Sequence, residues 1–375
     1  MANPFIMRVI PSDHPFANRI QELKELSSHA RNKANVVVFA PRRYGKTSLV
    51  KKIQANLKQD GFITIYTDFF MVASVDDVAE RIARSVYSIL HKRESFLQKG
   101  ARYLKTFKTF RPVFKPSPDD GFTFTVEPVS PDLSGIYLLD KVLEELGEFI
   151  HKESSGIHIV FDEFQEITDL KERRIEGIIR KHIQTHQTSY FFVGSRRRIL
   201  LDMFNQRNRP FYQSAIIYPL EPLPHEELKS FLVEQFKSGG KNCSRKNAEI
   251  ISSKVAQYPY YVQSLAYNVY EAAKRTVTSN DIEIGFEKLI SSERYGYEGI
   301  VQGLTRPQIL LLKALAVNPT AKILSTEYMK QYKLSIGGIQ YAQKKLERMD
   351  LIEKKNQIWQ VVDPVFRFWL GTWTK

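Results

Sequence analysis

The sequence predicts an α/β fold in which a parallel sheet carries helices on both faces, followed by a helical domain and a winged helix-turn-helix domain. The first observation is that short apolar runs ending in polar residues alternate with amphipathic helical patterns, which is typical of a parallel sheet. The second is that three short helical patterns near the C-terminus precede two strand-like runs, the order found in winged helices. We expect domains at residues 1–222, 223–302 and 303–375.

The first predicted strand leads into a motif typical of a phosphate-binding loop, or P-loop. Residues 36–39 are apolar, residues 40–47 end in Gly45-Lys46-Thr47, and an amphipathic helix follows. The backbone amides of such a loop and of the helix N-terminus favour an anion. Lys46 is then expected to reach the β- and γ-phosphates, and Thr47 to hold Mg²⁺. The alternative is a basic surface loop. The predicted nucleotide-binding residues of this segment are Ala40, Pro41, Arg42, Arg43, Tyr44, Gly45, Lys46, Thr47 and Ser48.

A second strand-like run, residues 158–161, ends in the adjacent carboxylates Asp162 and Glu163. An Asp at the end of a core strand beside a P-loop suits Mg²⁺, and Glu163 is placed to orient and deprotonate an attacking water. Alone, such a run is usually a strand that ends in a solvated turn. Ser195 follows another apolar run, and the carboxyl ends of parallel strands meet at one edge of a sheet. The predicted catalytic residues are Glu163, Lys46 and Ser195, and the predicted metal ligands are Thr47 and Asp162.

Composition describes an ordinary globular protein of 375 residues with 43% hydrophobic residues and a net charge of +14. The single cysteine, Cys243, excludes an intramolecular disulfide framework and a cysteine-based zinc site. One cysteine also fits a reducing compartment. Neither a signal-peptide core nor a run of 18 apolar residues is present. We therefore expect a cytoplasmic protein that is not embedded in a membrane.

Positive charge is concentrated in two regions. Residues 92–115 contain eight Lys and Arg against one Glu, and residues 301–375 contain twelve against five acidic residues. Such regions fit a polyanionic partner, most simply DNA, or a solvated charged face. The first region overlaps the start of a segment, residues 97–134, that we expect to be an inserted β-hairpin or loop. Its aromatic residues either stack on bases or pack the insertion onto the body, and we favour packing.

The predicted winged helix contains a third helix, residues 336–349, that carries Tyr341, Lys344, Lys345 and Arg348. A strand pair at 351–355 and 357–362 follows as the wing. In DNA-binding winged helices the third helix enters the major groove and the wing contacts phosphate. Gly337 and Gly338 start this helix without base-reading side chains, and winged helices attached to ATPases also act as protein-docking or lid modules. Both interpretations stay open.

The order of these motifs resembles the archaeal-type ATPase family, which belongs to the STAND branch of AAA+-like P-loop NTPases. The resemblance implies a Mg²⁺-dependent ATPase that binds ATP and ADP and acts as a nucleotide-controlled conformational switch, with a nucleotide-binding core, a helical lid and a winged helix. It also implies that Arg19 lies near the adenine and that Pro259 touches the nucleotide from the lid. The motifs that carry it are Phe16-x-x-Arg19-x-x-Glu22-Leu23, residues 40–49, 160–167 and 191–195, Tyr258-Pro259, and residues 362–369.

The chain departs from the family pattern at three places. Ala40 replaces a glycine of the loop, Tyr258 replaces a glycine of the lid turn, and Gln213-Ser214 stand where relatives carry Gly-Arg. The last change removes a positive charge, although Arg207 and Arg209 are close in sequence, and we therefore expect slow hydrolysis. The alternatives are a DNA-associated module that binds ATP with little hydrolysis, and a winged helix that docks a protein. Relatives often form rings with an arginine supplied across the interface; the candidates for that arginine are Arg196, Arg197 and Arg198.

Overall fold

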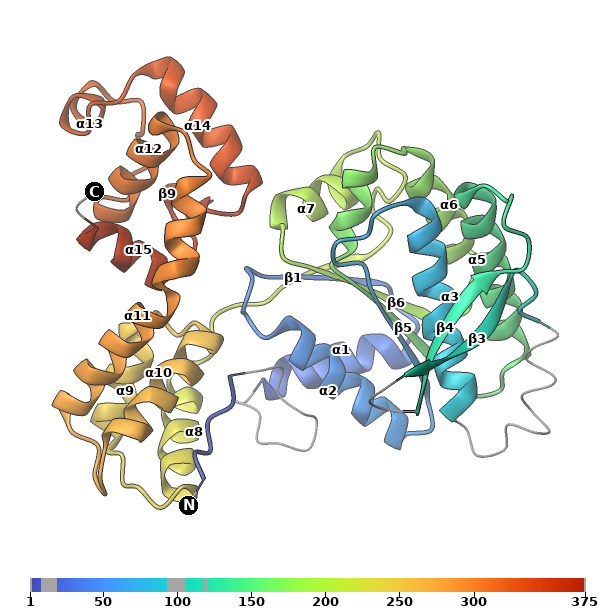
Figure 1. Ribbon diagram of the computed structural model, residues 1–375, viewed down its shortest axis with the longest axis horizontal. Helices are drawn as coiled ribbons and strands as arrows, with labels where there is room; N and C mark the ends of the chain where they lie inside the picture. Colours follow the sequence, from blue (N-terminus) through green and yellow to red (C-terminus); the bar gives the residue numbers. More distant parts are fainter. Residues whose placement is uncertain (1, 8–18, 93–105, 118–120, 374–375) are drawn as a thin grey trace. The chain divides into compact units, whose positions relative to one another are not determined.

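A five-stranded parallel sheet in the order β2-β5-β6-β1-β7 forms the centre of one part of the computed structural model (Figure 1). The structure describes residues 2–7, 19–92, 106–117 and 121–373. The three inner strands are entirely buried, because they are apolar runs covered on both faces. The strands are β1 (Val36–Phe39), β2 (Ile63–Asp68), β5 (Ile157–Asp162), β6 (Ser189–Gly194) and β7 (Ile216–Pro219).

Helices cover both faces of this sheet, with α1 and α2 on one face and α3, α5 and α6 on the other (Figure 1). The α/β fold class predicted from the sequence is therefore confirmed. The helices are α1 (Ile20–Arg31), α2 (Lys46–Gln59), α3 (Val75–Lys92), α5 (Gly135–Lys152), α6 (Arg174–Ile183) and α7 (Arg197–Asn205), and the 3-10 helix η2 (Phe164–Leu170) follows β5.

The insertion between α3 and α5 is an antiparallel hairpin of β3 (Phe110–Ser117) and β4 (Gly121–Pro128). The side chains of Phe107 and Phe110 are buried in the core. The Tyr87 hydroxyl donates to the carbonyl of Phe110 at 2.6 Å, which fixes the base of the hairpin on α3. These aromatic residues pack the insertion onto the body, as we favoured. Residues 93–105, which hold most of the predicted basic segment and Tyr103, lie outside the described residues.

The contacts of the chain define two compact units. One comprises residues 20–40 and 46–220, and the other comprises residues 1–19, 41–45 and 221–375. The loop segment 41–45 thus groups with the second unit, although the residues on either side of it belong to the first. The three domains expected from the sequence remain a prediction.

The main segment of the second unit, residues 221–375, starts with four helices: α8 (His225–Ser238), α9 (Arg245–Lys254), α10 (Pro259–Ala272) and α11 (Ser279–Gln302). A winged helix follows, composed of α12 (Arg306–Val317), α13 (Thr326–Gln331), α14 (Ile336–Arg348), β8 (Ile352–Lys355), β9 (Ile358–Val361) and α15 (Pro364–Thr372). Local sequence explains its boundaries. Ser335 caps α14 by accepting from the amide of Gly338. Asn356 and Gln357 both adopt positive φ, which gives the tight two-residue turn of the wing.

Over the described part of the chain, none of the helices combines the length and the apolar character that a membrane crossing requires.

Candidate active site

The loop between β1 and α2 has the backbone that its sequence predicts. Gly45 has φ of +82°, a left-handed conformation that favours glycine. Ala40 is not among the residues with positive φ, so an alanine fits where the common pattern has a glycine. The ammonium of Lys46, at the first position of α2, is buried and donates to the carbonyl oxygen of Ala40 at 2.8 Å. Arg42 is exposed and Ser48 is buried.

Asp162 ends β5 and meets the first turn of α2. Its side chain is 3% exposed, and its Oδ2 accepts from the Thr47 hydroxyl at 2.9 Å and from the Tyr66 hydroxyl at 2.5 Å. Burial raises the pKa of this carboxyl group above its ordinary range. A carboxylate beside a hydroxyl supplies the hard oxygen ligands that Mg²⁺ prefers. The two predicted metal ligands therefore lie together, and their chemistry fits the ion.

Tyr66 was not identified from the sequence, although it contacts the same carboxylate oxygen as Thr47. It lies on β2, which pairs with β5 in the register Tyr66 to Val160 and Asp68 to Asp162. The alternation of polar residues along β2 was the available signal. It could not be used because the sequence does not reveal which strand neighbours β5.

Glu163 has an unusual backbone conformation, and its side chain accepts hydrogen bonds from two donors. Its φ and ψ are 49° and 40°, a left-handed conformation that is uncommon for a residue with a side chain. Its Oε2 accepts from the Ser195 hydroxyl at 3.0 Å and from the amide nitrogen of Gln165 at 2.5 Å. Two of the predicted catalytic residues therefore meet where β5 and β6 end. Gln165 belongs to the motif quoted above, but no role was assigned to it.

Arg19 and Pro259, the residues assigned by resemblance, both lie near loop segment 41–45 in the second unit. The buried guanidinium of Arg19 donates to the carbonyls of Glu221 at 3.1 Å and Tyr44 at 3.5 Å. Pro259 is the first residue of α10. The ring of the preceding Tyr258 packs edge-on against the Tyr44 ring, with 4.9 Å between the ring centroids. The Tyr260 amide donates to the carbonyl of Arg43 at 3.3 Å. Two separate segments thus hold the backbone of the loop.

Arg43 connects the loop to the helices and, through them, to the winged helix. Its φ is +64°, and its guanidinium donates to Glu293 on α11 at 2.7 Å and to the Tyr261 hydroxyl on α10 at 3.2 Å. The Tyr261 hydroxyl in turn donates to the carboxylate of Asp363. Asp363 caps α15 by accepting from the amides of Val365 and Phe366, each at 2.9 Å. No local pattern in the sequence predicts this chain of contacts.

Two arginines considered from the sequence are already ion-paired within the sheet unit. The Arg196 guanidinium donates to Glu166 and Asp169, each at 2.7 Å, and its side chain is 14% exposed. The Arg209 guanidinium pairs with both oxygens of the Glu176 carboxylate on α6. Arg197 lies over the ring of Phe39, 5.5 Å from its centroid. In this structure Arg196 and Arg209 therefore both pair with neighbouring carboxylates.

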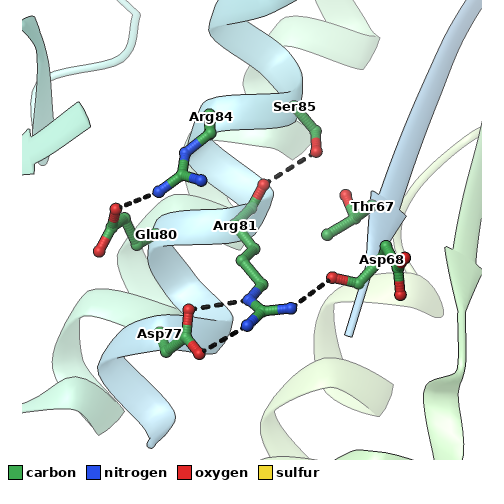
Figure 2. A pocket seen from close by; sticks show the side chains of 7 residues that line it. All are labelled: Thr67, Asp68, Asp77, Glu80, Arg81, Arg84 and Ser85. Atoms are coloured by element: carbon green, nitrogen blue, oxygen red, sulfur yellow. Dashed lines mark hydrogen bonds and ion pairs between the residues drawn. The ribbon is translucent and has the colours of Figure 1, made fainter. Parts of the chain in front are cut away.

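A polar pocket of about 480 Å³ lies beside the carboxyl end of β2 (Figure 2). Arg81 on α3 crosses it and donates to the Asp77 carboxylate at 2.8 and 3.0 Å and to the carbonyl of Asp68 at 3.0 Å. Because Asp68 is the register partner of Asp162, this clamp holds the strand end next to the predicted metal ligands. The pocket is lined by Thr67, Asp68, Asp77, Glu80, Arg81, Arg84 and Ser85.

The fold is that of P-loop NTPases, and the comparisons with known proteins agree. A family described as an ATPase domain predominantly from Archaea matches residues 16–265, and a probable winged helix domain matches residues 295–372. The chain belongs to this archaeal ATPase-domain family, and the resemblance noted from its motifs is confirmed. A search of curated proteins found no match.

Solved structures share the fold at low sequence identity. A Walker-type ATPase of Pyrococcus abyssi superimposes with a TM-score of 0.66 at 13% identity, over 97% of this chain and 99% of that one. The ORC2 protein of Aeropyrum pernix, solved as ADPNP and ADP complexes, gives 0.58 at 13% identity over 95% and 94%. The ORC1 protein of the same organism, solved in complex with DNA, gives 0.50 at 12% identity over 98% and 94%. These likenesses establish the fold alone.

Proposed function

We propose that this protein binds ATP together with Mg²⁺ at residues 40–48 and hydrolyses it slowly. The observation that carries the proposal is the contact between the Thr47 hydroxyl and Asp162 at 2.9 Å, because it brings the two metal ligands together at the N-terminus of α2. The Lys46 ammonium lies at the same helix end, where positive charge favours the phosphates. Membership of the ATPase-domain family supports the choice of ATP.

In this mechanism the protein mainly positions groups and stabilises charge. Lys46 neutralises the β- and γ-phosphates, and Thr47 and Asp162 hold Mg²⁺, which when bound offsets the charge that develops on the phosphate oxygens. Glu163 orients the attacking water and accepts its proton at the carboxylate. Ser195 keeps that carboxylate in place through its hydroxyl. Arg19 and Pro259 are included among the nucleotide-binding residues on the family resemblance, from which the loop departs at Ala40.

The proposal that hydrolysis is slow rests on the arginines considered for stabilising the transferring phosphoryl group. Charge on the transferring phosphoryl group is often stabilised by an arginine, supplied by the same chain or by a partner. Arg196 and Arg209 already pair with carboxylates, and Gln213-Ser214 replace the expected Gly-Arg. We propose that full activity requires an arginine from another subunit or a partner.

We also propose that the nucleotide controls the winged helix, so that the ATPase acts as a conformational switch. The support is the chain of contacts from Arg43 in the loop, through Tyr261, to Asp363 at the start of α15. A loop that changes shape around phosphates moves Arg43, and Arg43 shares a hydrogen-bond network with the last helix of the winged domain. A nucleotide switch needs such a connection between the nucleotide and the element that moves.

A second candidate function is DNA binding by the winged helix. The side chains of Tyr341, Lys344, Lys345 and Arg348 are exposed on α14, and Lys354 and Lys355 are exposed on the wing. Basic residues on these two elements suit contacts with phosphates. The alternative is a protein-docking surface.

Three measurements test the nucleotide site, the proposed base and the second function. We expect Lys46→Ala to lose binding of a fluorescent ATP analogue, and Glu163→Gln to keep binding while turnover falls by about 100-fold or more. Nucleotide binding by Lys46→Ala at the parent affinity overturns the site, and parent-rate turnover by Glu163→Gln overturns the base. A DNA mobility shift that weakens steeply with salt supports the second function, and a salt-insensitive or absent shift removes it.

A further inference from the structure

The side chain of Gln165, two residues after Glu163, is buried against the candidate base. Gln165 lies on η2 with 0% of its surface exposed, and its Nε2 donates to Oε2 of Glu163 at 2.5 Å. Glu163 itself is only partly buried. A fully buried amide therefore points at the carboxylate that the proposed mechanism uses.

The other end of the same amide makes no hydrogen bond. Oε1 of Gln165 is buried and has no partner among the described residues. Turning the amide over would place this oxygen against the Glu163 carboxylate, so the carboxylate determines the orientation. A buried polar atom without a partner lowers the stability of the folded protein. Stability therefore does not explain a glutamine at this position, whereas the contact with Glu163 does.

Gly194, the last residue of β6, supplies the space for this amide. A Cβ atom at position 194 would lie 1.9 Å from Oε1 of Gln165, closer than any real contact. Gly194 is not among the glycines with positive φ, so its role is to leave space. The next residue, Ser195, donates to the same Oε2 of Glu163. Oε2 is therefore held by one donor from η2 and another that follows β6.

We propose that Gln165 is the positioning residue of Glu163, and this inference rests on the proposed ATPase function. Its amide and the Ser195 hydroxyl both occupy Oε2, whereas Oε1 of Glu163 bonds to no donor in the part of the chain that the structure describes. Oε1 is then the oxygen that accepts the proton of the attacking water. The hydrogen bond from Gln165, added to that from Ser195, also restricts rotation of the Glu163 carboxylate about its side-chain bonds.

Gln165→Met tests this role, because methionine has a similar volume and lacks both the donor and the unpaired oxygen. We expect unfolding of the nucleotide-free protein at the parent temperature or above it, unchanged ATP affinity, and turnover reduced by about 10- to 100-fold. Crystals of the variant should show the Glu163 carboxylate away from Ser195. Parent-rate turnover, or a loss of thermal stability with a matching loss of ATP affinity, overturns the proposal.

Gln263→Met is the matched control. Gln263 is also buried, its Oε1 also lacks a partner among the described residues, and it lies on α10 in the second unit. We expect it to leave turnover unchanged. An equal loss in this variant overturns a specific role for Gln165.

A double-mutant cycle separates positioning from a general effect. If Gln165 acts through Glu163, then Gln165→Met adds no further loss of single-turnover rate in the Glu163→Gln background. Independent, additive losses overturn the inference. Failure of the proposed function gives a different result, because the parent protein then shows no Mg²⁺-dependent turnover at all.

Discussion

Tyr261 on α10 donates its hydroxyl hydrogen bond to Asp363, the residue that caps α15. The contact joins the four-helix part of the second unit to the last helix of the winged part. The same hydroxyl accepts from Arg43, so one residue of the loop and one of the winged helix are both hydrogen-bonded to the Tyr261 hydroxyl. Burial raises the pKa of Asp363, and hydrogen bonds from Tyr261 and from two backbone amides oppose this effect.

Removing this hydroxyl should weaken the second unit. We expect Tyr261→Phe to lower the free energy of unfolding by about 1–3 kcal/mol, because a buried carboxylate loses a donor. Tyr260→Phe is the control, since the Tyr260 hydroxyl makes one 3.3 Å contact with Glu293 at a partly exposed position. Urea denaturation of both variants provides the measurement. Equal effects of the two substitutions would contradict the role given to the Tyr261 contact.

Asp162 should reduce stability in the absence of nucleotide. Its pKa is raised by burial, so the charged form of the carboxyl group is disfavoured in the folded state. We expect Asp162→Asn to raise the unfolding temperature of the nucleotide-free protein at neutral pH, to raise it less in acid, and to abolish the Mg²⁺ dependence of ATP binding.

Asp68→Asn is the matched control for this prediction. Asp68 is the register partner of Asp162 on β2, but its side chain is exposed. We expect the Asp68→Asn variant to unfold at the same temperature as the parent protein. A fall in stability for Asp162→Asn would show that the carboxylate is needed for folding rather than for the metal.

The sequence predicted the parts of the site that depend on short segments. The loop before Lys46 and the strand before Asp162 can each be recognised in the sequence from an apolar run and the few motif residues that follow it. Because parallel strands end at one edge, Ser195 could be assigned to the same site as Glu163. These residues meet as expected, and the hydrogen bonds at 2.9 and 3.0 Å join them in pairs.

The residues that sequence reasoning missed depend on which segments become neighbours. The contact of Tyr66 with Asp162 requires that β2 lies next to β5, and the order of strands in a sheet is not a local property. Arg43 and Glu293 are 250 residues apart. Gln165 was visible in the motif, but its role depends on the space that Gly194 leaves, which only a three-dimensional structure reveals.

His158 should make folding sensitive to acid. Its ring is fully buried in β5, Nδ1 lies 2.7 Å from the Ser189 hydroxyl, and burial lowers its pKa to about 3. An unfolded histidine takes up a proton near pH 6.5. Between these two values the unfolded chain binds more protons, so stability falls by about 1.4 kcal/mol for each unit by which the pH is lowered.

Replacing this ring with a side chain that does not titrate tests the prediction. We expect His158→Gln to show a shallower loss of stability than the parent between about pH 6 and about pH 4. His186, whose pKa is lowered to about 4, continues to contribute to the slope. His225→Gln, at an exposed position, should keep the parent slope. A slope for His158→Gln that equals the parent slope would contradict the assignment.

Arg209 should contribute to stability and not to hydrolysis. Its guanidinium pairs with both oxygens of Glu176, whose side chain is 12% exposed, so Arg209→Ala leaves a largely buried carboxylate without its partner. We expect a loss on the order of 3 kcal/mol in the free energy of unfolding. The folded fraction should hydrolyse ATP at the parent rate. Arg207→Ala, at an exposed position, should change stability little.

The paired variant Arg209→Met with Glu176→Leu decides between the two roles of Arg209. Replacing both members of a buried ion pair by apolar residues is often neutral or stabilising. We therefore expect the pair to recover most of the lost stability and to keep the parent turnover per folded molecule. If stability recovers while turnover stays low, then the Arg209 guanidinium acts in the reaction, and the missing positive charge of the Tyr212-Gln213-Ser214 segment is supplied from three residues upstream.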